Sequence, residues 1–467
     1  MRGFVPTPTA IVDYMVDRLF AGRPPTKTSR ILDPGCGPGA FIEGIIRWCQ
    51  HRDLPVPRIT GVELDPSRYA EARERFARYS SISIVRADFL NQGRKSFDFV
   101  IGNPPYVPIT SFTEDEKVAY RATYLSARGR FDLYLLFFEQ ALRVLVPGGR
   151  LVFITPEKFM YVQTAAPLRR ILASLSVREI RLVDEATFGS LITYPTITTV
   201  DNAASEAPTT VLLRSGASRE IHMPPDGSSL LPLLNKHVAC VSALTLADVS
   251  LRVSCGVATG ADRIFVRNTR EIPDPLAPFA RPTISGRQLV PGGPLDASHS
   301  SLLVPYDEAG DLMSLEHLGA LGTYLQRPDI KRQLQQRTCV RRKPWYAFHD
   351  AVPLAEICRP KLLCKDITET PYFWIDSEGT IVPRHSVYYV VPKDPQHLRA
   401  LAEYLNGSAA REWLKAHCQR AANNFLRLQS AILKRLPVPA ELTESSINEE
   451  RRRRVRRPRA VSLELPF

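Results

Sequence analysis

The 467-residue sequence has no apolar stretch that approaches the roughly 20 residues needed to cross a membrane. The first six residues contain no apolar core of the kind that marks a secretion signal. We therefore expect a protein that stays in the cytoplasm and has no membrane partner. At this length, with 44% hydrophobic and 23% charged residues, the chain should form two or three globular domains.

The eight cysteines also lack organisation, because they form no Cys-x-x-Cys pair and no histidine stands at zinc-binding spacing from them. This pattern predicts reduced cysteines and no metal site. Negative charge is in deficit, since 61 Lys and Arg residues face 48 Asp and Glu residues, a net charge of +13. Residues 449–467 carry +4 of this, in a basic tail (445–467) that we expect to be disordered, and the remaining +9 favours a polyanionic partner.

The most informative stretch is Asn103-Pro104-Pro105-Tyr106. It follows an alternating apolar run at residues 97–102, which predicts that Asn103 lies at the carboxyl end of a strand. Ligands bind at that end in open α/β sheets. The prolines cannot donate, so their carbonyls and the Asn103 amide oxygen are aimed acceptors that suit a flat amino group, with Tyr106 on its face. A simple proline-rich turn is the alternative.

A second motif, Asp33-Pro34-Gly35-Cys36-Gly37-Pro38-Gly39, follows a short strand and precedes a helix at residues 41–49. Its glycines let the backbone approach a ligand closely, and Asp33 can accept from an ammonium group. The turn lacks the Lys-Ser/Thr of a phosphate loop, which favours a nucleotide-like ligand without its phosphates.

Two further predicted strands also end in acids. Glu63 ends the predicted strand that begins at residue 59. An acid at the end of the second strand of such a fold commonly binds ribose hydroxyls. Asp88 follows the predicted strand that begins at residue 82. Its carboxylate could accept a hydrogen bond from an adenine amino group, with Phe89 beside the adenine ring. Each acid taken singly could equally be a helix cap or a solvated turn residue.

The remaining pattern of residues 1–235 alternates strands with helices, which predicts a doubly wound, mainly parallel α/β sheet. Residues 7–19 read as a helix with a Thr cap, and residues 132–146 as an apolar helix. The aromatic residues of the second helix, Tyr134, Phe137 and Phe138, are expected in the core rather than at a ligand. Phe188 and Tyr194 lie in a predicted loop, where either could provide a second stacking face.

Strand and helix signals fade between residues 203 and 238, where we place a domain boundary. Residues 240–440 read as a mixed α+β domain with helices at 398–405 and 409–418. Exposed-looking basic and aromatic residues alternate within 256–265, 336–346 and 359–363, a composition that suits contact with phosphates and bases. A solvated face over buried aromatic residues is the alternative.

Together these motifs resemble the DNA adenine-N6 methyltransferases of the TaqI type, in which a class I S-adenosylmethionine-dependent fold precedes a target-recognition domain. The resemblance covers residues 6–200 and, more loosely, the C-terminal half, which ends in Leu-Pro-Val-Pro at 436–439. Asn103-Pro104-Pro105-Tyr106 is its most specific part.

The resemblance implies a role for each matching residue. Asn103, Pro104, Pro105 and Tyr106 correspond to the catalytic motif, and Phe188, with Tyr194 as a rival, to the second aromatic residue that stacks on a flipped adenine. The residues implied in cofactor binding are Thr7, Asp33, Gly35, Gly37, Glu63, Asp88 and Phe89. Asp33 departs from the Glu that is common in the family, so the shorter carboxylate would need a bridging water.

The function that this resemblance implies is site-specific methylation of adenine N6 in double-stranded DNA, as the modification part of a restriction-modification system. We expect a monomer, with or without a separate endonuclease and with no fused nuclease. Alternatives are methylation of a release-factor glutamine, a ribosomal RNA base or cytosine N4, since those enzymes carry related motifs. An inactive DNA-binding protein with the same fold is a further alternative, which the intact motifs at 33–39 and 103–106 disfavour.

Overall fold

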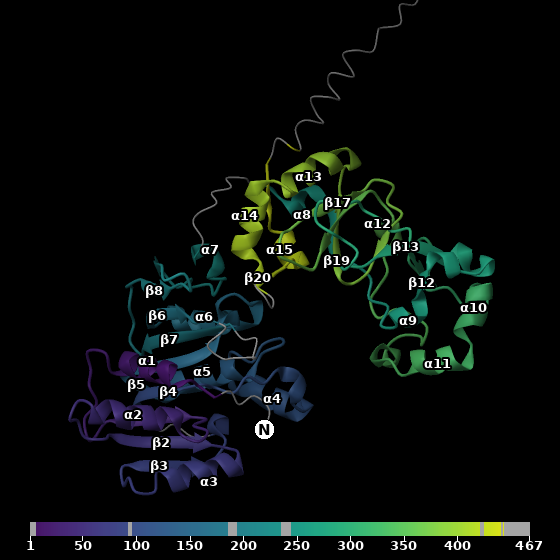
Figure 1. The fold of residues 1–467 in the computed structure, drawn as a ribbon. Coiled ribbons are helices and arrows are strands. Elements are labelled where there is room, and N and C mark those ends of the chain that lie inside the picture. The colour runs from purple at the N-terminus through teal and green to yellow at the C-terminus, as the bar shows by residue number, and fades with distance from the viewer. Residues whose placement is uncertain are drawn as a thin grey trace, which may run out of the picture. The chain divides into compact units, whose positions relative to one another are not determined.

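The computed structural model describes residues 6–91, 96–184, 194–234, 244–420, 425–439 and 442. The chain divides into two compact units, Met1–Lys236 and His237–Phe467 (Figure 1). None of the helices in the described residues is long and apolar enough to span a membrane.

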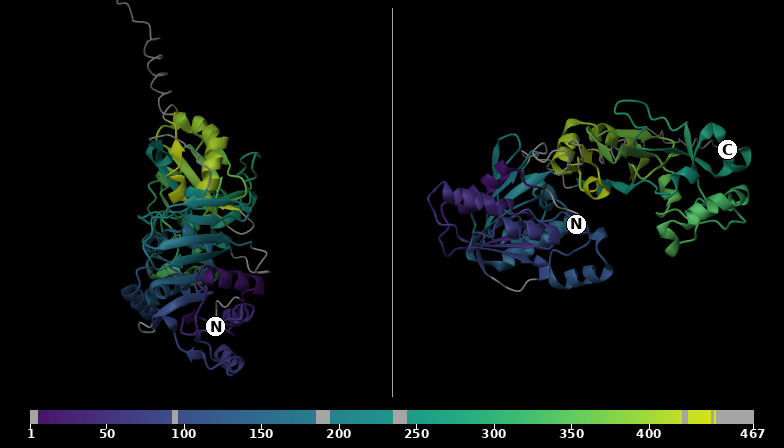
Figure 2. Two further views of the ribbon diagram at one scale, coloured as in Figure 1. Left: turned by 90° about the vertical axis from the view of Figure 1, so that its left-hand side faces the viewer. Right: turned by 60° about the horizontal axis from the view of Figure 1, so that its bottom comes forward.

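The first unit is built on a nine-stranded sheet (Figures 1 and 2). In spatial order its strands are β3 (Ile82–Arg86), β2 (Arg58–Glu63), β1 (Arg30–Pro34), β4 (Phe97–Gly102), β5 (Leu145–Pro156), β7 (Pro195–Asp201), β6 (Ser176–Leu182), β8 (Thr209–Leu212) and β9 (Ser218–Ile221). The first five in this order are parallel, whereas β7 is antiparallel to both of its neighbours. The strand order reverses between β1 and β4, which is where doubly wound sheets bind ligands.

Helices cover both faces of this sheet. One face carries a core formed by α1 (Thr9–Phe20) and α2 (Ala40–Gln50), with Phe76 at the end of α3 (Pro66–Arg75). The other carries α5 (Leu133–Val144) and α6 (Ala166–Ala173), and the short helices α4 (Glu114–Thr123) and α7 (Leu231–Leu234) complete the unit. The doubly wound fold predicted from the sequence is therefore confirmed.

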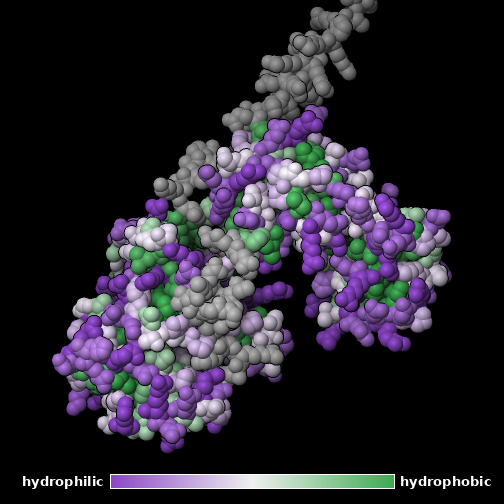
Figure 3. Space-filling model, viewed as in Figure 1, coloured by the Kyte–Doolittle hydropathy of each residue, from purple (hydrophilic) through white to green (hydrophobic). Residues whose placement is uncertain are grey.

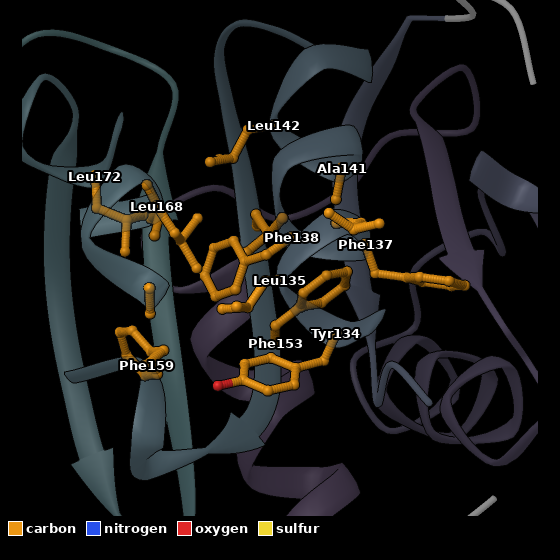
Figure 4. Close-up of a cluster of buried hydrophobic side chains, with 14 of the residues drawn as sticks. Tyr134, Leu135, Phe137, Phe138, Ala141, Leu142, Phe153, Phe159, Leu168 and Leu172 are labelled. Atoms are coloured by element: carbon orange, nitrogen blue, oxygen red, sulfur yellow. The ribbon is translucent and has the colours of Figure 1, made fainter. Parts of the chain in front are cut away.

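Helix α5 supplies the centre of the second core. Tyr134 and Phe138 are almost completely buried, as predicted, and Phe138 packs edge-on against Phe153 of β5. Figure 4 shows Phe137 pointing away from these residues, toward the opposite side of the helix. This orientation brings Phe137 to the ligand cavity described below.

Two local predictions need correction. Helix α1 starts at Thr9 and has no side-chain cap, because its N-cap residue is Pro8, whose side chain has no acceptor; the Thr7 hydroxyl bonds to Asn103 instead. The region 203–238 is not merely a boundary, since β8 and β9 lie within it and extend the sheet. Both strands are only four residues long, which is too short for a clear alternation of apolar and polar residues.

Four small sheets are present in the described residues of the second unit. The first has the order β11 (Ser250–Cys255), β19 (Val387–Pro392), β15 (Lys361–Lys365) and β17 (Phe373–Asp376), and the second the order β12 (Val266–Asn268), β14 (Ser300–Leu303), β13 (Ala280–Ile284) and β18 (Val382–Pro383). The others are β16 (Ile367–Thr368), β21 (Leu426–Arg427) and β20 (Gln419–Arg420), and the pair β10 (Leu244–Thr245) and β22 (Pro437–Val438).

Helices complete two cores in this unit that are separate from those of the first. They are α8 (Leu246–Val249), α9 (Asp262–Phe265), α10 (Gly319–Leu325), α11 (Pro328–Gln335), α12 (Leu354–Ile357), α13 (Leu398–Leu405), α14 (Ser408–His417) and α15 (Ser430–Leu433). The unit is the mixed α+β domain expected from the sequence, and α13 and α14 lie where helices were predicted.

Candidate active site

A cavity of about 580 Å³ lies at the carboxyl ends of β1, β2 and β4. It gathers residues from widely separated motifs, as the predicted topology requires. Those of the predicted site that line it are Thr7, Gly35, Glu63, Asp88, Phe89, Asn103 and Pro105. Asp33, Gly37, Pro104 and Tyr106 lie in the same motifs but do not line the cavity.

The glycine-rich turn is fastened by Glu63. One oxygen of this carboxylate accepts from the backbone N–H of Gly37 at 2.9 Å, and the other accepts from the N–H of Asp65 at 2.7 Å. Gly35 has a φ of +96°, a left-handed conformation that favours glycine. Because each carboxylate oxygen has a second lone pair, Glu63 can hold the turn and still accept from a ligand.

The Asp33 carboxylate is buried beneath this turn. Its side chain has no exposed surface, and neither oxygen has a hydrogen-bond partner within the part of the chain that the structure describes. Burial, and then the charge of Glu63, raise its pKa well above the usual value. A buried carboxylate without partners is costly unless it is protonated or meets a donor, so this residue fits a ligand that brings a cationic or N–H group close to the end of β1.

Asn103 is held by the N-terminal segment. Its side-chain nitrogen donates to the Thr7 hydroxyl at 3.1 Å, and both residues line the cavity. Since the nitrogen side of the amide faces Thr7, the oxygen side is turned away from it. The contact therefore orients the acceptor that the sequence predicts to be catalytic.

The rest of the Asn-Pro-Pro-Tyr motif lies between the cavity and the core. Pro104 is buried, and Pro105 reaches the cavity wall. The Tyr106 hydroxyl donates to the carbonyl of Ile154 at 3.3 Å, and its ring meets Tyr134 edge-on at 6.2 Å between centroids. Burial raises the pKa of this phenol, so Tyr106 is neutral and acts as a fixed aromatic surface.

The far end of the cavity combines aromatic walls with an acid. Phe89 lies 5.3 Å from Phe137, measured between ring centroids, and both line the cavity. The Asp88 carboxylate accepts from the backbone N–H of Leu90 at 3.0 Å and from the Asn91 amide at 2.8 Å. Phe137 belongs to the buried core, as predicted, and it also lines the cavity, because helical spacing does not reveal which side of a buried helix meets a cavity.

One wall of the cavity comes from α4 and the turn before it, and no sequence motif predicted it. Phe112, Glu116 and Tyr120 all line it. Phe112 and Tyr120 meet edge-on at 5.6 Å between centroids, while Glu116 closes a capping box with Thr113. The only available signal was the Thr-x-x-Glu of that capping box, which predicts a helix start rather than a ligand contact.

The two aromatic residues proposed for base stacking have different outcomes. Phe188 lies outside the described residues. Tyr194 immediately precedes β7, and its carbonyl accepts from the backbone N–H of Glu157 at 2.7 Å. Since β7 runs antiparallel to β5, Tyr194 lies at the same edge of the sheet as the end of β5.

Two basic residues of the second unit that were predicted to be exposed form contacts inside the unit instead. The half-buried Arg337 donates to the carbonyls of Thr259, Trp345 and Ala347 at 2.6–2.8 Å. Lys361 is fully buried and paired with Asp376. The basic residues of these segments gave no indication in the sequence that they have partners inside the unit.

Other arginines in the same segments are exposed, as predicted: Arg263, Arg341, Arg342 and Arg359. Figure 3 shows a mainly hydrophilic surface over the part of this unit that contains α10 and α11. Among the described residues of the whole chain, no group of three or more His, Cys, Asp or Glu side chains could hold a metal ion.

Two family models match the chain. Residues 59–188 match the Eco57I restriction-modification methylase, and residues 317–438 match the TaqI-like C-terminal specificity domain. The first match spans Glu63, Asp88 and Asn103. The second lies entirely within the second unit.

Curated relatives agree with these matches. The type II methyltransferase M.XhoI of Xanthomonas vasicola is 30% identical over 396 residues, which cover 76% of this chain and 71% of the relative. The type II methyltransferase M.PaeR7I of Pseudomonas aeruginosa is 28% identical over 501 residues, covering 94% and 86%. The solved DNA complex of the type IIL restriction-modification enzyme MmeI shares the fold, with a TM-score of 0.66 and 12% identity over 97% of this chain and 68% of that one.

Proposed function

The chain belongs to the type II methyltransferases of restriction-modification systems, DNA methyltransferases that use S-adenosylmethionine, and we propose that within this family it methylates the exocyclic N6 of adenine in double-stranded DNA. The single observation that carries the proposal is Asn103, which stands at the end of β4 in an Asn-Pro-Pro-Tyr sequence and is oriented by Thr7. The target adenine is flipped out of the duplex to reach this position.

In this proposal Asn103 and Pro104 bind the adenine amino group. The Asn103 side-chain oxygen and the Pro104 carbonyl each accept a hydrogen bond from one N–H of this amino group, which draws the nitrogen away from planar geometry and makes its lone pair more nucleophilic. Tyr106 stacks on the base, with Tyr194 or Phe188 on the other face. S-adenosylmethionine supplies an activated methyl group when bound.

The cavity fits that cofactor in chemistry and size. We propose that Glu63 accepts from the ribose hydroxyls, and that Asp88 accepts from the cofactor's adenine while Phe89 packs on the ring. Asp33, whose buried oxygens have no hydrogen-bond partner among the described residues, then lies behind Gly35 and Gly37 and favours the positive methionine end through its charge. About 580 Å³ is within the range of small-molecule sites.

We further propose that the second unit, at residues 240–440, reads the DNA sequence and that the basic tail at 445–467 contributes non-specific attraction to DNA. An asymmetric reader on one chain needs no twofold partner, so the protein acts as a monomer. A separate endonuclease that cuts the same unmethylated sequence would complete the system.

The experiment that tests the proposed function is sequencing with modified-base detection on plasmid DNA from cells that express the protein. Cells that express Asn103→Ala provide the control. We expect N6-methyladenine at one short motif with the wild type and none with the variant. Calorimetric titration with S-adenosylhomocysteine should give a similar affinity for both proteins, because the substitution spares the cofactor acids.

Each other result has a definite meaning. N4-methylcytosine at a short motif would show that the target is the amino group of cytosine rather than that of adenine. Undiminished methylation by Asn103→Ala would refute the assigned role of the motif. Cofactor binding without any DNA methylation would shift the assignment to an RNA or protein substrate.

A further inference from the structure

Arg214 lies two residues after β8 and makes three contacts at the edge of the sheet where β5 ends and β7 begins. Its Nη2 donates to the Glu157 carboxylate at 2.7 Å, and its Nε donates to the carbonyl of Val183 at 3.0 Å. Its guanidinium carbon lies 5.3 Å from the centre of the Tyr194 ring. A single side chain thus joins the residue after β6, the residue after β5 and the residue before β7.

Glu157 makes this arrangement rigid. Its side chain is only 6% exposed, and that of Arg214 is 20% exposed, so the ion pair is largely shielded from water. The backbone N–H of Glu157 donates to the carbonyl of Tyr194, while its carboxylate holds the arginine that covers the Tyr194 ring. Tyr194 is therefore fixed both through its backbone and through its side chain.

The fixed tyrosine lies close in the sheet to the Asn-Pro-Pro-Tyr motif. Gly102 of β4 pairs with Phe153 of β5, and Pro156 of β5 pairs with Pro195 of β7. β4 and β7 therefore flank β5 at about 10 Å from each other, two strand spacings, and Tyr194 lies about three residues farther along β5 than the end of β4. The Tyr106 hydroxyl bonds to the Ile154 carbonyl on the intervening strand.

From these contacts we propose that Arg214 and Glu157 are positioning residues for methyl transfer, which hold Tyr194 as an aromatic wall of the target-base site. The inference rests on the proposed function in that it needs a target base beside Asn103. It holds for adenine and cytosine alike, because either base presents a flat face for stacking. The turn that follows β8 thereby gains a role in the active site.

The chemistry of the contacts requires arginine at this position. A planar guanidinium can pair with a carboxylate, donate through Nε and stack on a ring at the same time, whereas a lysine ammonium is a point charge on a flexible stem. Arg214→Lys should keep the attraction to Glu157 and lose the Val183 bond and the stacking. Arg214→Ala should lose all three contacts.

The test measures single-turnover methyl incorporation from labelled S-adenosylmethionine into plasmid DNA that contains the methylated motif. The proteins are the full-length wild type, Arg214→Ala, Arg214→Lys, Tyr194→Ala and the double variant. Arg219→Ala, an arginine on β9, is the matched control. Titration with S-adenosylhomocysteine and the thermal unfolding midpoint are recorded for each protein.

We expect Arg214→Ala to slow methyl transfer about 10- to 100-fold, as small misplacements of reacting groups do. Arg214→Lys should lie between it and the wild type, Arg219→Ala should stay within about twofold of the wild type, and cofactor affinity should be unchanged throughout. In the Tyr194→Ala background the arginine substitution should add little, because the two residues act as one unit.

Three results would overturn the inference. One is a rate for Arg214→Ala within twofold of the wild type. Another is independent, multiplicative effects of the Arg214 and Tyr194 substitutions. The third is an equal fall in rate and cofactor affinity, which would indicate a general structural role. If Arg214→Ala does not fold, the same criteria apply to Arg214→Lys. The proposed base is tested separately, because this assay counts methyl groups on any base.

Discussion

The side-chain nitrogen of Asn103 donates to the hydroxyl of Thr7 at 3.1 Å, although the two residues are 96 positions apart in the sequence. The contact joins the segment before α1 to the end of β4. It gives a threonine without any capping role a clear purpose, which is to hold the Asn103 side chain at the end of β4 with its nitrogen toward the N-terminal segment.

Replacing Thr7 by valine removes the hydroxyl and keeps the shape. We expect methyl transfer to slow about 2- to 10-fold, since one hydrogen bond contributes about 0.5–1.5 kcal/mol and the amide can then turn. Affinity for S-adenosylhomocysteine should change less than the rate, because the cavity wall keeps its form. Single-turnover assays check this, with Thr9→Val at the exposed start of α1 as the control. Equal effects of the two substitutions would contradict the assigned role of Thr7.

Glu116 should influence which cofactor base the cavity accepts. Asp88 and Glu116 both line the cavity. Burial, and to a smaller extent the charge of Glu116, raise the pKa of Asp88, against the hydrogen bond from the N–H of Leu90. Two carboxylates can accept hydrogen bonds from the amino group of adenine, whereas they repel the carbonyl oxygen that hypoxanthine carries at the same position. Glu116→Gln, which preserves the capping box, should reduce the preference for S-adenosylhomocysteine over S-inosylhomocysteine about 2- to 10-fold.

Calorimetric titration with the two ligands measures that preference. Glu114→Gln is the matched control, because it removes a charge from the same helix at an exposed residue that pairs with Lys117 and does not line the cavity. An unchanged preference in Glu116→Gln would show that α4 covers the cavity without recognising its contents.

Acid should weaken the first unit through Asp201. Burial tends to raise the pKa of this carboxyl, but hydrogen bonds from Arg150 and Arg178 outweigh it and lower the pKa below the ordinary 3.8. A carboxyl with a depressed folded-state pKa contributes stability that is present above pH 3.8 and is lost as the pH falls through the folded-state value.

Asp201→Asn should therefore lower the free energy of unfolding by about 1.5–3 kcal/mol at pH 6, and by less as the pH falls below 3.8. Urea unfolding followed between pH 3 and pH 6 measures the difference. Asp13→Asn, which breaks the exposed pair with Arg47, should cost much less. A difference between wild type and Asp201→Asn that did not vary with pH would contradict this explanation.

The sequence predicted the framework of the site because strand ends leave a readable pattern. An apolar run followed by Asp88 or Asn103 identifies both the strand and its carboxyl end, and parallel strands bring such ends to one edge. Glu63 was identified in the same way, although its bonds to the backbone of Gly37 and Asp65 were not. Backbone partners leave no trace in the letters of a sequence.

Other parts depend on tertiary contacts that local patterns do not encode. Lys361 and Arg337 stand in basic segments of the kind that bind DNA. In the structure, however, Lys361 pairs with a buried aspartate, and Arg337 donates to carbonyls from two segments. Phe137 and Tyr120 are aromatic residues on helices, and only the packing of those helices decides that they face a cavity. The same holds for Arg214, whose partners come from three different strand ends.

Each unit buries its own apolar residues in its own cores. A core substitution within the matched specificity domain at 317–438 therefore acts first on the cores of the second unit. If the second unit reads the DNA sequence, as we propose, natural selection can alter that reading in small steps while the cores of the first unit stay unchanged. Lineages that carry such a chain can thereby diverge in the sites they mark without first losing the ability to mark any.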